Sequence, residues 1–146
     1  MKYNDELNAI RLEYDVEKED FTKAGEASSN IKKVLRQLGI DAAVIRKVAI
    51  VTYEAEMNIV IHSLGGKIIV TIHTDRIEVV AKDNGPGIEN IELALKEGYS
   101  TASNKVRELG FGAGMGLPNM KKSSDEFYIE SNKGGSTTVT MIINTL

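Results

Sequence analysis

The chain has 146 residues, of which 42% are hydrophobic and 27% are charged, a balance that excludes disorder and fibrous repeats. The formal net charge is -3, and the lysine and arginine residues are scattered, so the sequence predicts no binding to nucleic acid. The absence of cysteine excludes disulfides and thiol chemistry, and no apolar run reaches the roughly 18 to 20 residues of a membrane helix. We therefore expect one cytoplasmic domain over residues 1–146, with neither a membrane nor nucleic acid as a partner.

The first third of the chain predicts one strand and two helices. Apolar and polar residues alternate over 7–16, which is the pattern of a half-buried strand. Helical spacing follows from an expected cap at Asp20 to a stop at Gly39. Asp41 then caps a longer helix that ends at Gly65–Gly66. This second helix is apolar on nearly every side, so we expect it to be buried against more than one neighbour.

Two hairpins are predicted from β-branched residues and turn residues. The first joins 67–73 to 76–82 through a tight turn at Thr74–Asp75, and the second spans 126–144 and turns at Gly134–Gly135. Between the hairpins, the sequence predicts a short amphipathic helix, a long polar and glycine-rich loop, and another short helix; these occupy 88–98, 99–116 and the residues from Leu117 onward. This order fits an α+β fold, a two-layer sandwich with a mainly antiparallel sheet and helices on one face.

Three polar or glycine-rich elements interrupt this pattern, and the first is the pair Glu54 and Asn58. Their spacing places both on one helix face, with Cβ atoms roughly 6 Å apart. A carboxylate and an amide among apolar neighbours are costly to bury without partners, so this pair is a candidate site. An exposed helix face or a local capping network is the alternative explanation. Glu56 lies about 160° from Asn58 on the helical wheel, and we expect it to be solvated.

The second element is "KDNGPGI", residues 82–88, which follows a predicted strand directly. A surface turn would explain Asn-Gly-Pro-Gly fully, because these residues favour turns. A turn does not require Asp83, however, and a carboxylate fixed at the end of a strand can accept a hydrogen bond from an amino group of a ligand.

The third element is "ELGFGAGMGLPNMKK", residues 108–122, in which every second residue from 110 to 116 is glycine. Glycine lets backbone N–H groups approach a phosphate, and the N-terminus of the helix that follows adds partial positive charge. A flexible loop is the alternative. The dinucleotide fingerprint is excluded because no strand runs into these glycines, and the Gly-Lys-Ser/Thr of a Walker loop occurs nowhere in the chain.

Together, the three elements resemble the boxes of the GHKL ATP-binding family, which includes DNA gyrase, a major heat-shock chaperone, histidine kinases and mismatch-repair ATPases. "EAEMN" resembles its asparagine box, "DNGPG" its Asp-x-Gly-x-Gly box and "GFGAGMGL" its second glycine box. Within that family, "EGYST", "GAGMGLPNMKK" and "DEF" are most similar to the bacterial anti-sigma-factor and switch serine/threonine kinases of partner-switching pathways. The similarity runs from about Phe21 to Ile143. It implies the two-layer GHKL (Bergerat) fold with a glycine-rich ATP lid.

The resemblance also implies roles for single residues. Glu54 would be the general base for the attacking hydroxyl, Asn58 the ligand to Mg²⁺, and Asp83 the acceptor for the adenine amino group. Thr137 would lie near that carboxylate, although this chain has Ser136 where the family usually has glycine. Two further groups of residues are implied. The adenine pocket would be shaped by Gly85 and Gly87. The phosphates would be bound by Gly110, Gly112, Gly114, Met115, Gly116 and Leu117.

The function implied by the resemblance is that of a serine/threonine protein kinase with ATP and Mg²⁺ as cofactors. Its substrate would be a STAS-domain antagonist, a sigma factor or a downstream phosphatase would be a further partner, and a homodimer is left open. One alternative is an ATP-gated binding module that sequesters a sigma factor or regulator with little or no kinase activity. Another is a detached catalytic domain of a histidine kinase, which would leave phosphohistidine on its partner.

Overall fold

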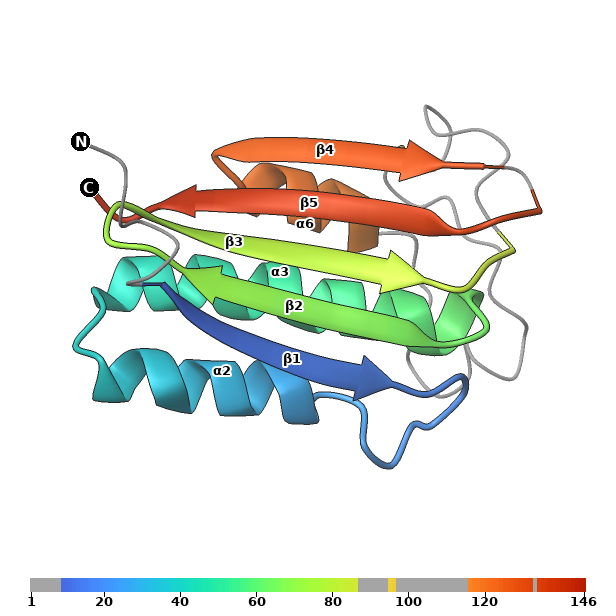
Figure 1. Ribbon diagram of the computed structural model, residues 1–146, viewed down its shortest axis with the longest axis horizontal. Coiled ribbons are helices and arrows are strands. Elements are labelled where there is room, and N and C mark those ends of the chain that lie inside the picture. The colour runs from blue at the N-terminus through green and yellow to red at the C-terminus, as the bar shows by residue number, and fades with distance from the viewer. Residues whose placement is uncertain (1–8, 87–94, 97–115, 133) are drawn as a thin grey trace.

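The computed structural model describes residues 9–86, 95–96, 116–132 and 134–146. In these ranges the chain forms a five-stranded antiparallel sheet of order β1-β2-β3-β5-β4, and three helices cover one face of it (Figure 1). The predicted α+β architecture, with its antiparallel sheet and helices on one side, is confirmed. The helix predicted over 88–98 and nearly all of the predicted lid lie outside the described residues.

Both predicted hairpins are present. The backbone N–H of His73 donates to the carbonyl of Arg76 at 2.8 Å, which closes the two-residue turn of the first. The bounds of the elements are β1 Ile10–Val16, α2 Glu26–Gln37, α3 Ala42–His62, β2 Gly66–Ile72, β3 Arg76–Asp83, α6 Gly116–Ser123, β4 Glu126–Ser131 and β5 Thr137–Asn144.

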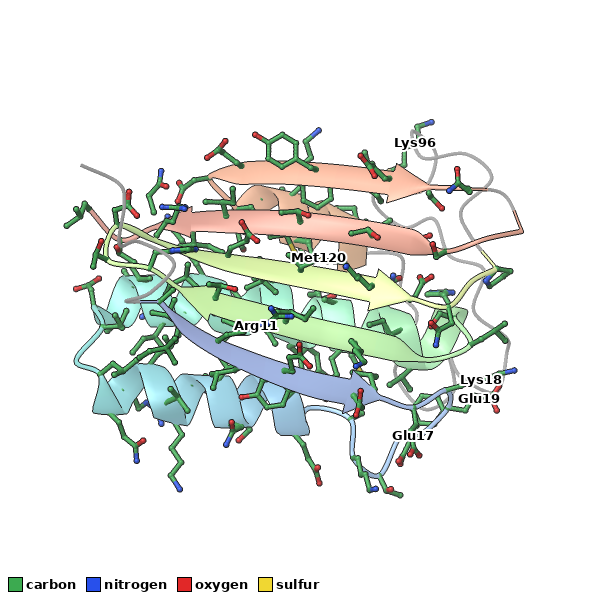
Figure 2. All side chains as sticks on the ribbon, viewed as in Figure 1. Arg11, Glu17, Lys18, Glu19, Lys96 and Met120 are labelled. Carbon is green, nitrogen blue, oxygen red and sulfur yellow. The ribbon has the colours of Figure 1, made fainter. Side chains whose placement is uncertain are left out.

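Helix α3 is the central element of the helical layer, with α2 on one side and α6 on the other (Figure 1). It begins as predicted, because the Asp41 carboxylate accepts a hydrogen bond from the N–H of Ala43 at 3.0 Å. Its burial against both helices and the sheet explains why the sequence is apolar on nearly every side. The core lies between the two layers, where Met120 of α6 is fully buried behind the sheet (Figure 2).

The predicted start of the first helix was wrong. The Asp20 carboxylate accepts from the Thr22 hydroxyl at 2.7 Å and from the Lys23 N–H at 3.3 Å, so it stabilises a turn before the helix. Helix α2 starts after Gly25, which has φ +97° and gives no side-chain cap. The predicted stop is confirmed, since Gly39 has φ +72° just beyond the helix.

The cap that Gly25 lacks comes from Glu56 of the neighbouring helix. Its two carboxylate oxygens accept from the backbone N–H groups of Ala27 and Ser28 at 3.3 and 3.4 Å. Glu56 is only 4% exposed, so the prediction that it is solvated was wrong. Burial raises its pKa, and the amide hydrogen bonds oppose that shift. A helical wheel of α3 alone could not show this contact, because the hydrogen-bond partners lie on α2, 28 and 29 residues away in sequence.

The other face of the sheet carries no helix in the described part of the chain, and Arg11 of β1 projects from it (Figure 2). None of the described helices is long and apolar enough to cross a lipid bilayer.

Candidate functional site

Asp83 is the last residue of β3 and pairs with Gly66 of β2. Its Oδ1 atom accepts two hydrogen bonds, from the backbone N–H groups of Gly85 and Thr137, each at 2.9 Å. Within the described residues, both hydrogen bonds to this carboxylate end on Oδ1. As far as the described part of the chain is concerned, Oδ2 is available to accept a hydrogen bond from a ligand, in a fixed position at the end of the strand.

The turn after Asp83 is tied to two other loops. The carbonyl of Gly85 accepts from the N–H of Leu64 at 2.9 Å, and the carbonyl of Pro86 accepts from the N–H of Gly134 at 2.7 Å. Gly85 has φ +107°, and a Cβ atom there would lie 2.9 Å from the carbonyl oxygen of Gly135. Residue 85 must therefore be glycine, because its φ is positive and because a side chain would clash with Gly135. A surface turn alone would not need these contacts with two other loops.

Thr137 is 2% exposed, and its hydroxyl lies 2.6 Å from the hydroxyl of Ser131 across the β4–β5 hairpin. Because Thr137 reaches Asp83 through its backbone N–H, the contact does not depend on the residue before it. Ser136 is exposed, and its departure from the family pattern leaves this contact in place. The resemblance placed Thr137 near the carboxylate of Asp83, and the two are hydrogen-bonded.

Glu54 lies half-buried on α3, where that helix packs against α6. A Cβ atom built on Gly116, the first residue of α6, would lie 3.3 Å from Glu54 Oε2, so the absence of a side chain there leaves room for the carboxylate. Burial raises the pKa of Glu54, and a hydrogen bond from the side chain of Asn119 partly offsets this. The chain thus positions one carboxylate of raised proton affinity at the start of α6.

Asn58 lies one turn beyond Glu54 and is also half-buried. In the described part of the chain, no group of three or more histidine, cysteine, aspartate or glutamate side chains could hold a metal ion. Mg²⁺ retains several waters and takes few protein ligands, so a single amide oxygen beside a phosphate ligand fits it better than a closed cage would.

The remaining predicted residues divide into two groups. Leu117 is the second residue of α6, and its side chain is buried in the core. Only its backbone is therefore available to a ligand. Gly87, Gly110, Gly112, Gly114 and Met115 lie outside the described residues.

Sequence reasoning missed the role of two side chains, Asn119 at this site and Glu56 at the start of α2. Asn119 follows Gly116 by three residues, so it returns to the same face of α6 after one turn, and this spacing could have predicted its contact with Glu54. Nothing local in the sequence points to the cap that Glu56 forms.

Comparison with protein-family models adds a match over residues 43–145 to the family described as histidine kinase-, DNA gyrase B-, and HSP90-like ATPase. The chain belongs to this ATPase family. The match starts at the second residue of α3 and includes Glu54, Asn58, Asp83 and Thr137. ATP is accordingly the nucleotide that this domain type implies.

Two groups of curated relatives are similar to the chain over much of its length. The serine/threonine-protein kinase RsbT of Bacillus subtilis is 29% identical over 115 residues, which are 76% of this chain and 80% of that protein. An anti-sigma F factor of Clostridium perfringens is 29% identical over 146 residues, covering 94% of this chain and 99% of the relative. The anti-sigma F factor of Caldanaerobacter subterraneus is 36% identical over a shorter stretch, 60% of this chain and 62% of its own length.

A solved structure supports the fold. A chain in the SiaB-SiaC complex from Pseudomonas aeruginosa superposes with a TM-score of 0.58 and covers 98% of this chain and 94% of its own, at 12% sequence identity. At 12% sequence identity, this structural similarity supports the fold and nothing further.

Proposed function

We propose that this chain is a Mg-ATP-dependent serine/threonine protein kinase that phosphorylates a small protein partner, a STAS-domain antagonist, in an anti-sigma or switch pathway. The observation that carries the proposal is the position of Glu54. Its half-buried carboxylate, with a raised pKa, lies against the first residue of α6, directly after the glycine-rich segment. A base at that point can take the proton of a hydroxyl that attacks a phosphate held by the glycines.

The Asp83 end of the site fits an adenine ring. Oδ1 is held by two backbone N–H groups, so the carboxylate cannot rotate freely, and Oδ2 can accept from an exocyclic amino group. Gly85 keeps the adjacent backbone close to Gly135 without a side chain between them. The residues present therefore suit a flat nitrogen heterocycle with an amino group, as ATP has.

Asn58 would hold Mg²⁺ through its amide oxygen, and Gly116 with the glycines before it would offer N–H groups to the phosphates. When bound, Mg-ATP supplies the phosphoryl group and the charge neutralisation that its transfer needs. The chain itself contributes orientation and a proton acceptor, Oε1 or Oε2 of Glu54. Asn119 keeps that carboxylate turned toward α6.

The named relatives support a protein as the acceptor. One is called a serine/threonine-protein kinase and others are called anti-sigma F factors. The alternative, a binding module without kinase activity, would use Asn58 and Asp83 but would have no need of a base at Glu54. The two functions therefore make opposite predictions for one substitution.

The test is Glu54→Ala, assayed with ATP carrying a labelled γ-phosphate against purified STAS-domain proteins from the source genome. We expect ATP affinity to stay within about threefold and phosphate transfer to fall by about 10²- to 10⁴-fold. Asn58→Ala is the matched comparison on the same helix, and it should lose Mg-dependent ATP binding instead. Full transfer by Glu54→Ala would contradict the role of base. Tight ATP binding without transfer to any partner would favour the binding module, and acid-stable phosphoserine would exclude a histidine kinase.

A further inference from the structure

A groove of about 920 Å³ runs along the exposed face of α3, between α2 and α6. One end lies at the turn between α2 and α3, beside Ile40 and Ala42. The other end reaches Glu54 and Asn119, the two side chains that meet at the start of α6. The groove therefore leads from the surface of the helical layer to the proposed base, and Asp83 is not among its lining residues.

The groove is lined by cations from all three helices. Lys32 and Arg36 come from α2, Arg46 from α3 and Lys122 from α6. Among the described residues that line the groove, Glu54 is the only carboxylate, although the chain as a whole has a net charge of -3. Four cations and one carboxylate of the described residues thus line the groove, so it attracts a ligand of negative charge.

Apolar side chains lie between these cations. Ile50 is 37% exposed and Tyr53 is 40% exposed, and both line the groove one turn or less before Glu54. A large aliphatic and an aromatic side chain exposed together beside charged groups form the kind of surface that a protein partner buries.

We propose that this groove is the docking site for the protein substrate, and that the docked segment is acidic, with an apolar side chain near the acceptor hydroxyl. The proposal rests on the proposed kinase function and adds the chemistry by which the substrate is recognised. Carboxylates of the substrate contact Lys32, Arg36 and the cations across the groove. Its apolar side chain packs on Ile50 and Tyr53, and the adjacent hydroxyl then lies at Glu54.

The same cations could attract nucleic acid, but the groove suits protein better. A polyphosphate chain that followed the groove would gain little from the exposed apolar side chains of Ile50 and Tyr53, which a protein segment can bury. The negative net charge of the chain opposes a polyanion at long range, whereas a short segment with a few carboxylates feels mainly the local cations.

The test uses the full chain with Mg-ATP and two fluorescein-labelled peptides of equal length, each with one serine and the same leucines. One carries four glutamates and the other four lysines. By fluorescence anisotropy at about 0.1 M ionic strength, where charges more than about 10 Å away are screened, we expect the glutamate peptide to bind and the lysine peptide not to bind. The double variant Lys32→Glu/Arg36→Glu should lower the affinity for the glutamate peptide by about tenfold or more. A second pair, Arg46→Glu/Lys122→Glu, tests the opposite wall and should act in the same direction.

The matched control is Lys33→Glu/Lys47→Glu, which makes the same change in net charge at exposed residues that do not line the groove. We expect this control to alter binding by less than about threefold, since its charges are screened from the peptide. Equal weakening by the control and the groove variants would overturn the proposal, as would tighter binding of an oligothymidylate than of the glutamate peptide.

A separate titration with a fluorescent ATP analogue distinguishes failure of the proposed kinase function from failure of the docking site. If the unmodified chain does not bind ATP, the proposed function itself is contradicted. Intact ATP binding with peptide affinity unchanged in both groove variants would contradict the docking site alone. In a transfer assay with the glutamate peptide, the groove variants should raise KM and leave kcat nearly unchanged, because their side chains lie away from the reacting atoms.

Discussion

Replacing Asp83 by asparagine separates ligand recognition from stability, because the structure fixes how the new side chain must lie. Two backbone N–H groups, from Gly85 and Thr137, point at Oδ1. Since both are donors, the carbonyl oxygen of the introduced amide faces them, and its NH₂ group takes the place of Oδ2. The substitution therefore keeps both internal hydrogen bonds and presents a donor to the ligand where an acceptor was.

The two effects differ in size. A hydrogen bond to a charged acceptor contributes about 1.5–3 kcal/mol and a neutral one about 0.5–1.5 kcal/mol, so two weakened bonds lower the free energy of unfolding by roughly 2 kcal/mol. At the ligand, the lost charge-assisted bond and the unpaired donor together amount to roughly 3–5 kcal/mol, a loss of about 10²- to 10⁴-fold in ATP affinity.

Calorimetric titration with ATP and urea unfolding measure the two quantities. Titration with GTP adds a control, because the NH₂ group of the introduced amide can donate to the carbonyl oxygen of guanine; the preference for ATP over GTP should therefore shrink. Asp83→Ala gives the contrast, since it removes the acceptor for both N–H groups and should destabilise the fold more than asparagine does. ATP affinity of Asp83→Asn within about threefold of the unmodified chain would refute the adenine role.

Three further predictions concern glycines and a buried acid. Gly116→Val should displace Glu54, only 3.3 Å from the built Cβ, and lower nucleotide affinity and transfer before it lowers the melting temperature. Gly66→Ala brings a Cβ within 2.1 Å of a carbonyl oxygen and should cost roughly 3 kcal/mol or more in urea unfolding; Gly39→Ala, with open space, should cost about 1–2 kcal/mol. Because the folded-state pKa of Glu56 is raised, its contribution to stability is present below the unfolded pKa, near 4.5, and is lost as pH rises through the folded pKa. Unfolding free energy relative to Glu56→Gln should therefore fall with pH in that window; a flat or rising difference would contradict the burial effect.

The parts of the fold that the sequence predicted correctly depend on local rules. Asp41 caps α3 through an N–H two residues away, and the Thr74–Asp75 turn closes through a hydrogen bond between His73 and Arg76. Asp83 could be identified because a carboxylate directly after a strand and before Asn-Gly-Pro-Gly is not needed by the turn. In each case the residues that determine the geometry are neighbours in sequence, so spacing and turn chemistry are sufficient.

The errors and omissions come from contacts between helices. Asp20 looked like a cap and instead stabilises a turn, because the cap of α2 is supplied by Glu56, 28 and 29 residues from its partners. The sequence likewise showed its cations as scattered, yet the packing of α2, α3 and α6 brings four of them to one groove.

These contacts are connected through α3. Glu56 fixes the start of α2 against α3, and α2 carries Lys32 and Arg36 along the groove on that side. On the other side, Asn119 of α6 contacts Glu54, and the same short helix carries Lys122. A change that moves α6 toward or away from α3 therefore alters the base and one wall of the groove together.

Because α6 directly follows the glycine-rich segment, nucleotide occupancy and substrate docking should be coupled: peptide affinity measured with and without Mg-ATP should differ in the unmodified chain. The difference should shrink in Gly116→Val, and equal peptide affinity in both states would rule out coupling through α6.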